Sequence, residues 1–505
     1  MDPYTGHLLS LILFFPTIVA LLLLFFPARW DSFFRWVAFI ASLVPFALTL
    51  SLWSQFVPAQ TGFQFVEKVD WYAALRSSYV VGVDGISLPM IILTTLLIPL
   101  AILASFSIKE RVKAFMILFL LLETGMLGVF MTLDLLLFFV FWEVGLVPMY
   151  FLIAQWGSSN RNYASLKFIL YTMGGSLGLL LAIQMIGVVT GTFDMQTLFA
   201  TWPSAKSTFL GLGTPTIKAI AFWAFVVAFA IKVPIWPFHT WLPDAHTEAP
   251  TGGSMILAGV LLKLGAYGFL RLVLPLYPVE SARYAEILAG LAVAAIIFGA
   301  LAAWGQTDFK RLVAYSSINH MGFVILGIAA AAWAANLKDT TNATIAVNGA
   351  VLQMFNHGLS AAGMFFLVGV IYERTHTRNL TEYGGLYAKL PIYGSILGFT
   401  AMGSLGLPGL GGFVSEFLVV RGAWPIFSLA TALGMIGLFF TGAYVMKALK
   451  QVLHGPINKR WQGTIAEINV REIVVIAPLM VLMLAIGLWP TFILDMINRA
   501  AMLWY

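Results

Sequence analysis

The amino-acid sequence predicts an all-α polytopic membrane protein with about 14 transmembrane helices, among them two inverted five-helix repeats. First, 60% of the 505 residues are hydrophobic and only 10% are charged, whereas soluble domains are about half apolar and about a quarter charged. So few charges cannot cover the surface of a soluble enzyme of this size. Second, the chain contains a series of apolar runs of roughly 20 residues, the length that a bilayer span requires. Third, proline and glycine interrupt two of those runs.

The apolar runs are bounded by charged residues, proline or glycine, and they define the expected transmembrane segments. They cover residues 8–26, 34–53, 86–107, 112–132, 135–155, 165–190, 216–238, 252–273, 285–304, 311–334, 346–372, 392–421, 427–448 and 472–494. The largest gap between them, at residues 54–85, is too short for a separate soluble domain. An acidic residue and no Lys or Arg precedes the first run, so we expect that span to be retained rather than cleaved as a signal peptide.

Two of the expected spans contain residues that break helices. The seventh contains Pro234 and Pro237, which have no N–H group, so the carbonyls of Ala230 and Val233 should lose their helical partners. The twelfth contains a cluster of such residues, namely Gly406, Pro408, Gly409, Gly411 and Gly412. Broken backbone at membrane depth is tolerated where it is buried in protein or lines a hydrated cavity. Two unrelated proline kinks are the alternative interpretation.

Each broken span is the fourth in a set of five, which indicates an internal repeat. The sets are spans four to eight and spans nine to thirteen, and an odd number of helices inverts the second set relative to the first. We therefore expect residues 1–111 to hold helices one to three, 112–273 the first repeat, 285–448 the second repeat, and 449–505 helix fourteen and the tail.

The basic residues predict the orientation in the membrane. With the amino terminus outside, seventeen of the 28 Lys and Arg residues, among them Lys310, face the cytoplasm, and nine, among them Arg271, face outside. Cytoplasmic loops of membrane proteins carry an excess of Lys and Arg, so both termini are expected outside. Membrane topology also explains the formal charge of +6, and no basic run with interleaved aromatic residues indicates a nucleic-acid partner.

Charged residues lie inside several spans, away from any interface. Four have this position, namely Glu143, Lys232, Lys263 and Glu416, with Glu123 as a fifth candidate. A charge at the bilayer centre costs about 2.5–3.5 kcal/mol on insertion scales, so such residues usually serve a function. Buried ion pairs that hold the bundle together are the structural alternative, but they stabilise poorly because desolvation offsets their attraction. We interpret the four residues as candidates for proton translocation.

Two histidines extend this set, because imidazole titrates near neutral pH. His320 lies ten residues after Lys310, about 15 Å along a helix and therefore near mid-depth. His357 lies within the eleventh span. A lone histidine in a span is as often a structural hydrogen-bonding residue, so both interpretations of each histidine stay open.

Metal, nucleotide and cysteine chemistry are not indicated. The chain has no cysteine, which excludes disulfides, thiolate zinc sites and cysteine-ligated iron–sulfur clusters. Four residues near the seventh span suggest a metal site at first, namely His239, Asp244, His246 and Glu248, but their spacing matches no zinc motif. The glycines of 406–412 are not followed by the Gly-Lys-Ser/Thr of a phosphate-binding loop. We therefore expect no metal and no cofactor on this chain.

Four segments resemble the antiporter-like membrane subunits of respiratory complex I. They are AIKVPIWPFHTWLPDAHTEAPT at 230–251, LLFFVFWEVGLVPMY at 136–150, FKRLVAYSSINHMG at 309–322 and GLPGLGGFVSEF at 406–417. The similarity extends over most of the chain, from about residue 80 to about residue 450. It implies a fold of fourteen helices with the two inverted repeats inferred above.

The resemblance also assigns roles, position by position. It implies that Glu143 is the glutamate of the fifth helix and that Lys232 is its lysine partner on broken helix seven. Lys263 matches the central lysine of helix eight, and Glu416 matches the terminal residue on helix twelve. Sibling subunits usually have lysine at this last position, so Glu416 favours the chain M branch of the family.

The resemblance implies a proton-pumping subunit of NADH:quinone oxidoreductase in a bacterial inner membrane. Its partners would be the other membrane subunits of complex I, including sibling antiporter-like subunits, and the electrons would pass to quinone through other chains. The same family includes Mrp-type cation/proton antiporter subunits and membrane-bound hydrogenase subunits, which are alternatives. A purely structural membrane anchor is a third, and the charges inside the spans argue against it.

Overall fold

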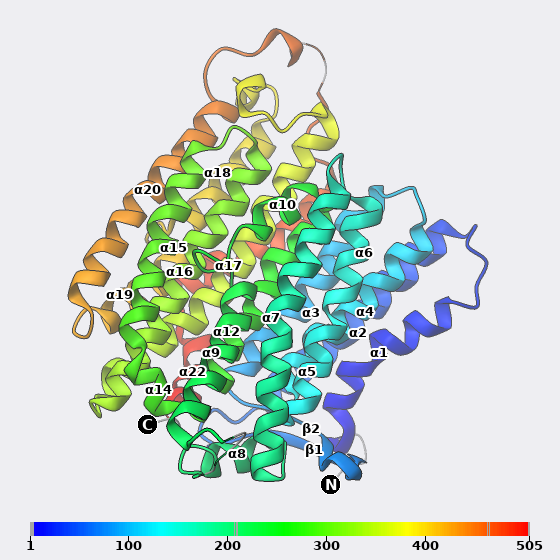
Figure 1. The fold of residues 1–505 in the computed structure, drawn as a ribbon. Coiled ribbons are helices and arrows are strands. Elements are labelled where there is room, and N and C mark those ends of the chain that lie inside the picture. Colours follow the sequence, from blue (N-terminus) through cyan, green and yellow to red (C-terminus); the bar gives the residue numbers. More distant parts are fainter. Residues whose placement is uncertain (1–4, 207, 209–210, 462, 464, 503–505) are drawn as a thin grey trace.

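The computed structural model describes residues 5–502 except 207, 209–210, 462 and 464. The prediction that both termini lie outside also concerns residues 1–4 and 503–505, which are not among the described residues. It is a bundle of long helices that run roughly side by side, with one small β-hairpin at one end (Figure 1). Both described chain ends lie at the hairpin end, which we call the terminus face. The other end, with the connections at 157–160, 306–308 and 376–390, is the loop face.

The described residues form 22 α-helices. The first are α1 (Leu8–Leu23), α2 (Asp31–Gln55), α3 (Ser87–Ala104), α4 (Val112–Met131), α5 (Leu135–Val144), α6 (Leu146–Trp156), α7 (Arg161–Thr190), α8 (Met195–Thr201) and α9 (Thr214–Lys232). The next are α10 (Trp241–Glu248), α11 (Thr251–Ile256), α12 (Leu262–Gly268), α13 (Leu274–Leu276), α14 (Pro278–Arg283), α15 (Ala285–Gly305) and α16 (Phe309–Asn336). The last are α17 (Thr340–Thr375), α18 (Pro391–Leu405), α19 (Gly411–Ala423), α20 (Ser428–Leu453), α21 (Val470–Leu488) and α22 (Thr491–Met502).

Within the described residues, 12 helices are long and apolar enough to cross a membrane. One of them joins α5 and α6, and another runs continuously from α11 to α13 through two π-helical segments, Leu257–Leu261 and Phe269–Val273. The remaining two predicted spans are the shorter α1 and the interrupted pair α18 and α19. The prediction of an all-helical protein with about fourteen membrane-crossing segments is therefore confirmed.

The centre of the bundle is formed by three spans whose apolar windows are 100% buried, namely α3, Thr251–Leu276 and α17. By contrast, only 33% of the window is buried in α2, α20 and α21, which lie at the periphery. Their exposed leucine, phenylalanine and valine side chains suit contact with lipid. A charged or polar residue on one of the three central spans is therefore shielded from lipid by other helices.

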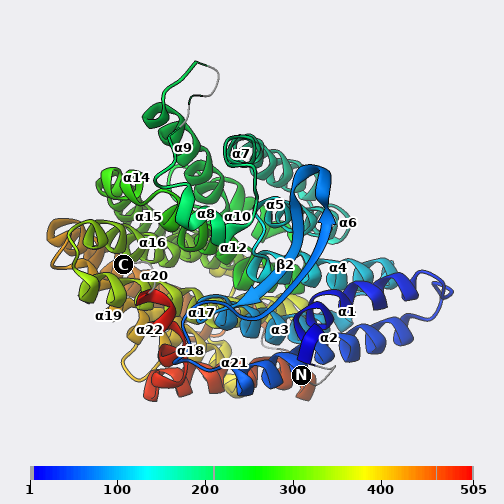
Figure 2. The ribbon, with the colours of Figure 1, turned by 90° about the horizontal axis from the view of Figure 1, so that it is seen from below.

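Residues 54–85, expected only as a connection, contain an antiparallel hairpin of β1 (Gln64–Tyr72) and β2 (Ser77–Val83). The hairpin extends across the terminus face (Figure 2). The Asp134 carboxylate accepts hydrogen bonds from Ser77 Oγ at 3.0 Å and from the Ser78 N–H at 3.1 Å. The same carboxylate caps α5 by accepting from two backbone N–H groups of its first turn. The hairpin therefore fixes the start of the helix that carries Glu143.

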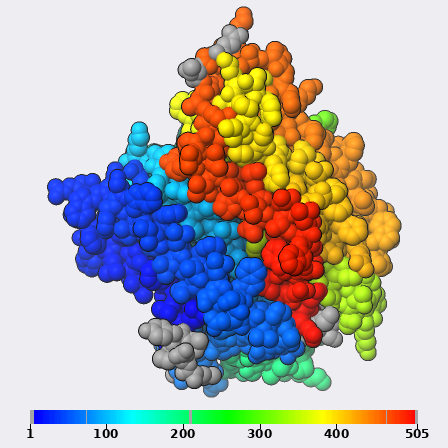
Figure 3. Space-filling model, turned by 180° about the vertical axis from the view of Figure 1, so that it is seen from behind, coloured from blue at the N-terminus to red at the C-terminus, as the bar shows by residue number. Residues whose placement is uncertain are grey.

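The carboxyl-terminal helices close the back of the bundle. In Figure 3 the red carboxyl-terminal segment lies beside the blue amino-terminal segment. The rings of Trp53 and Phe492 pack with their centroids 6.1 Å apart, and the Asn348 amide donates a hydrogen bond to Asn498. The two ends of the chain are thus held together at the terminus face.

Candidate functional site

The first predicted break separates α9, which ends at Lys232, from α10, which begins at Trp241. The backbone is not left open in the way that Pro234 and Pro237 suggested, because the Ala230 carbonyl accepts a hydrogen bond from the Ile235 N–H at 2.9 Å. The next carbonyl, that of Ile231, accepts from the Trp241 indole Nε1 at 2.8 Å. As the sequence predicted, the Ala230 carbonyl loses its i+4 partner, and an i+5 bond replaces it.

The second predicted break separates α18, which ends at Leu405, from α19, which begins at Gly411. Gly406 and Gly409, on either side of Pro408, have φ values of 78° and 94°, which side chains with a Cβ rarely adopt. A Cβ on Gly406 would lie 2.8 Å from Glu416 Oε2. The carboxylate of Glu416 therefore packs directly against the break.

Four of the residues predicted from the sequence meet in the centre of the bundle. Lys263 Nζ lies 2.7 Å from His357 Nδ1, and the rings of His357 and His320 have centroids 5.6 Å apart. His320 Nδ1 lies 2.9 Å from Glu416 Oε1. All four side chains are buried, with exposed fractions between 0% for Lys263 and 5% for Glu416. They come from α12, α17, α16 and α19, and we call them the central row.

Polar groups complete the hydrogen bonds of the central row at its Glu416 end. Gln353 Nε2 donates to Glu416 Oε1 at 3.2 Å. The hydroxyl oxygens of Ser404 and Tyr444 each lie 3.3 Å from His320 Nε2. Within the described residues His357 Nε2 has no hydrogen-bond partner. A buried polar atom in this state marks a place where water fits the chemistry of the site.

A π-helical segment supports Lys263. The Lys263 ammonium donates to the carbonyl oxygen of Ala258, which lies in the segment Leu257–Leu261. In a π turn the backbone bonds run from i to i+5, and such turns are frequent at functional sites. The ammonium is therefore held between a backbone carbonyl and an imidazole, with no carboxylate among the partners that the structure gives it.

The expected ion pair between Glu143 and Lys232 is open in this structure. The Lys232 ammonium lies 5.0 Å from the centroid of the Trp142 ring, and no salt bridge joins it to Glu143 among the described side chains. Glu143 is only half-buried, whereas Lys232 is 2% exposed. The aromatic face of Trp142 takes the place of the carboxylate, because the negative face of an indole attracts a cation.

Glu123 is fully buried, and neither of its oxygens has a partner in the described part of the chain.

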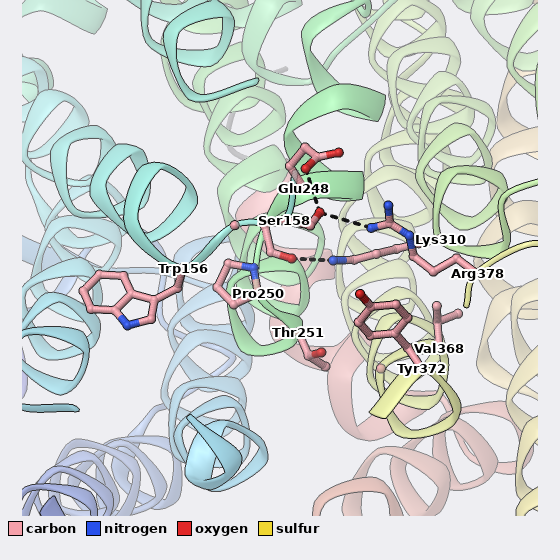
Figure 4. Close-up of a pocket in the computed structure, with 12 residues that line it drawn as sticks. Trp156, Ser158, Glu248, Pro250, Thr251, Lys310, Val368, Tyr372 and Arg378 are labelled. Carbon is pink, nitrogen blue, oxygen red and sulfur yellow. Dashed lines mark hydrogen bonds between the residues drawn. The ribbon is translucent and has the colours of Figure 1, made fainter. Parts of the chain in front are cut away.

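A cavity of about 240 Å³ opens at the loop face (Figure 4). Lys310 and Arg378 reach into it from one side, and Ser158 and Glu248 line the other. Ser158 Oγ donates to Glu248 Oε2 at 2.6 Å, and Arg378 donates to the Thr247 carbonyl. Lys310, counted as a cytoplasmic charge in the sequence, is only 7% exposed, and its ammonium donates to the Ala249 carbonyl.

The segment from His239 to Glu248 supplies no metal cluster among the described residues. Asp244 is engaged by Lys167 at 2.7 Å and by Arg311 at 3.4 Å. His246 is fully buried and stacks on Phe365 with ring centroids 4.4 Å apart, and neither ring nitrogen has a partner in the described region. Sequence reasoning considered His246 only as a metal ligand, so it missed a buried imidazole near the central row.

Arg271 was also misplaced by charge counting, which put it at the outer surface. It is 1% exposed and pairs with Asp84 through Nη2 and Oδ1 at 2.5 Å. A partner 187 positions away in the sequence cannot be found from hydropathy alone.

A protein-family model described as NADH:quinone oxidoreductase/Mrp antiporter, TM, matches residues 132–441. The chain belongs to this family. A second model, described as NADH-ubiquinone oxidoreductase chain 4, amino terminus, matches residues 9–133. Together these matches confirm the resemblance inferred from four motifs, and the second extends it into the amino-terminal region where the motifs were less distinctive.

Relatives of this antiporter family match nearly end to end. The NADH-quinone oxidoreductase subunit M of Rhodobacter capsulatus is 42% identical over 500 residues, covering 97% of this chain and 95% of that protein. The NADH-ubiquinone oxidoreductase chain 4 of Marchantia polymorpha is 37% identical over 503 residues, covering 99% and 97%. The chain is therefore a member of the subunit M and chain 4 branch and an integral multi-pass membrane protein.

Solved structures show the same fold. A chain of respiratory complex I from Thermus thermophilus with bound NADH superposes with a TM-score of 0.85 at 27% identity, covering 98% of this chain and 99% of that one. A chain of the Mrp complex from Dietzia sp. DQ12-45-1b also has a TM-score of 0.85, at 22% identity and with 99% and 97% coverage. In both structures the matching chain belongs to a larger complex.

Proposed function

We propose that this chain is the proton-translocating membrane subunit of an NADH:quinone oxidoreductase. The observation that carries the proposal is the central row, in which Lys263, His357, His320 and Glu416 form a continuous series of buried titratable groups. Such residues inside membrane spans are costly and mark ion or proton pathways. The amide nitrogen of Gln353 and the hydroxyl groups of Ser404 and Tyr444 lie beside the row and keep the series polar.

The proton steps follow from the donor and acceptor capacity of each group. His357 Nδ1 accepts a hydrogen bond from the Lys263 ammonium, so a proton that arrives there is released from the other ring nitrogen, Nε2. His357 Nε2 is the atom without a partner among the described residues, and we assign the next transfer to the neighbouring His320 ring, whose centroid lies 5.6 Å from that of His357. His320 Nδ1 then passes the proton to Glu416 Oε1. Histidine suits this relay because one ring nitrogen can accept a proton while the other releases one.

The two faces of the bundle take different roles in the proposal. The loop face carries the excess of basic residues and becomes the cytoplasmic side, where the cavity with Lys310 and Glu248 admits protons toward Lys263. The terminus face becomes the outer side, and Glu416 releases protons along α19, which runs from the break toward that face. Release works against a membrane potential of about 2.3 kcal/mol per charge per 100 mV.

In this proposal the first repeat supplies the control and the carrier Lys263, and the second repeat supplies His357, His320 and Glu416 of the relay. We assign residues 112–273 and 285–448 to the two repeats, as the positions of the breaks suggest. When Lys232 leaves the Trp142 ring and pairs with Glu143, the position of a positive charge in the first repeat changes. That movement changes how strongly the surroundings of Lys263 favour its charged form. The electrons pass through other chains of the complex, so no redox centre is assigned to this one.

The Mrp-type cation/proton antiporter is the second candidate, and one specific observation favours it. The family model at 132–441 covers both protein types, and the Mrp complex shares the fold with a TM-score of 0.85. The amino-terminal match at 9–133 is to chain 4 of NADH-ubiquinone oxidoreductase, which supports the complex I subunit. Co-purification distinguishes the candidates, because a complex I subunit is expected to bring soluble flavin and iron–sulfur chains with it.

Replacing Lys263 by arginine tests the relay. Arginine keeps the positive charge and does not deprotonate in proteins, so Lys263→Arg is expected to lower the protons translocated per NADH while the complex still assembles. Lys450→Arg, at an exposed position near the loop face, is the matched control. The measurement is proton uptake into vesicles that contain the whole complex, with quinone reduction recorded in parallel. Wild-type proton stoichiometry in Lys263→Arg would exclude a deprotonating lysine at this position.

A further inference from the structure

Arg271 is a buried cation at the terminus-face end of helix span eight that the central row does not use. It lies in the π-helical segment Phe269–Val273 and is 1% exposed. Its Nε donates to the Tyr267 hydroxyl oxygen at 3.0 Å, and its guanidinium carbon lies 4.9 Å from the Phe63 ring centroid. A fully buried charge is expensive, so its retention on a central span calls for a role.

Asp84 holds this cation in one place. Arg271 Nη2 lies 2.5 Å from Asp84 Oδ1, and the same oxygen accepts from the N–H groups of Ile86 and Ser87 at 3.1 Å and 3.0 Å. Asp84 lies between β2 and α3, so the hairpin and the central span α3 both fix its position. The pair therefore has no freedom of the kind that Lys232 has beside Trp142.

The pair lies between an open cavity and the central lysine. A cavity of about 360 Å³ on the terminus face is lined by Asp84 and Arg271. Lys263 lies eight residues before Arg271 on the same span, which is about 12 Å along a helix. Tyr267, one turn from each, faces Arg271 and donates its hydroxyl proton to the Phe130 carbonyl at 3.0 Å. This hydroxyl is the polar group between Lys263 and the cavity along the span.

We propose that Arg271, fixed by Asp84, is a positive charge that closes the terminus-face cavity off from Lys263 and so prevents protons from returning through helix span eight. The inference rests on the proposed function, in which the terminus face is the outer side. It separates release through Glu416 from a second route between the outside and Lys263. Without a barrier on that route, the membrane potential would drive protons back to the carrier.

Arginine suits this role for two reasons. It stays protonated at every physiological pH, so the barrier cannot be titrated away. A fixed positive charge in a narrow, poorly solvated passage repels cations and hydronium, as arginine does in selective channels. Removing a barrier of about 1.4 kcal/mol corresponds to roughly a tenfold rise in proton flux. The Tyr267 hydroxyl remains as a hydrogen-bonding group, so the passage left behind is polar enough to conduct.

The test is passive proton flux in vesicles that contain the whole complex, with no NADH or quinone added. A pH gradient is imposed with the potential clamped, and a pH-sensitive dye trapped inside reports the flux. We expect Arg271→Met to raise the flux roughly tenfold, and Arg271→Lys, which keeps the charge, to stay near wild type. A passive proton flux in Arg271→Met that equals that of wild type overturns the proposal.

Two further variants separate the charge from the packing. Asp84→Asn breaks the ion pair but leaves the cation, so its passive proton flux is expected to stay near wild type. A flux as large as that of Arg271→Met would mean that the pair blocks the passage by its bulk and not by its charge, and would overturn the proposal. The double variant Asp84→Asn with Arg271→Met leaves no unpaired buried charge, and it is expected to fold and to leak. Adding Lys263→Met to the double variant should abolish the leak, and a persistent leak would show that the route does not pass through Lys263.

These readouts need no turnover. If the complex fails to pump but Arg271→Met leaks, the proposed function fails and the barrier stands. If pumping depends on Lys263 but no variant of Arg271 leaks, the function stands and the barrier fails.

Discussion

Replacing Gly406 by alanine tests how closely proton transfer depends on the break in span twelve. Gly406 has a φ of 78°, so any other residue is strained there, at a cost of roughly 1–2 kcal/mol. The new Cβ would lie 2.8 Å from Glu416 Oε2, and the carboxylate would have to shift by a few tenths of an ångström. That shift moves the partner of His320, now 2.9 Å from Glu416 Oε1. Misplacement by about 1 Å can cost roughly a hundredfold in rate, so we expect the His320 to Glu416 step to slow by roughly tenfold.

Gly409→Ala is the matched control for this variant. Gly409 lies in the same break with a φ of 94°, but nothing lies within 4 Å of its added Cβ. Both variants are therefore strained to a similar degree, and only Gly406→Ala displaces Glu416. The assay counts protons translocated per NADH in vesicles with the whole complex, with the amount of assembled complex measured on native gels. Equal proton counts for the two variants would refute the reasoning, whether both are normal or both are low.

The other predictions concern the two glutamates and Asp84. Glu143→Gln is expected to remove most proton translocation through this chain while the complex remains assembled, because Lys232 loses its alternative partner; normal proton counts per NADH would contradict the switch. Glu416→Gln is expected to stop release, whereas Glu416→Lys should keep part of it because lysine can still exchange a proton; a fully active glutamine variant would remove Glu416 from the path. Burial raises the pKa of Asp84, but the charge of Arg271 and its hydrogen bonds outweigh burial and leave the pKa below its ordinary value of 3.8. A lowered carboxyl pKa adds stability that is present above about pH 4 and is lost as the pH falls through the folded-state pKa. We therefore expect the solubilised wild-type complex to have a longer half-life than Asp84→Asn near neutral pH. This difference in half-life should shrink below about pH 4. An advantage that grows with acid would contradict this sign.

The transmembrane segments and both breaks could be predicted from the sequence because their signals are local. Apolar length alone defines a span, and Pro234, Gly406 and Pro408 act on their own backbone. The hairpin could not be predicted in this way. Glu67, Lys68 and Asp70 interrupt the apolar pattern of β1, and a hydropathy average over a window as long as a membrane span does not detect strands.

The candidate site was only partly predictable for a different reason. Lys263 and Glu416 stand out because a charge inside an apolar run is conspicuous. Lys263 meets His357 and not a carboxylate because of the way α12 packs against α17. No local sequence pattern reports that packing. Arg271 was counted as an outer charge because it lies close to the end of its span. Its burial follows from Asp84, which the hairpin and α3 bring to it.

Helix α17 carries both His357 and Gln353, one turn apart, and each contacts a different half of the molecule. His357 meets Lys263 of span eight, and Gln353 meets Glu416 of span twelve. Because α17 is one unbroken helix of 36 residues, the two contacts are held at a fixed spacing on a single element. The partner of the lysine and the partner of the glutamate therefore cannot be displaced relative to each other without breaking this helix.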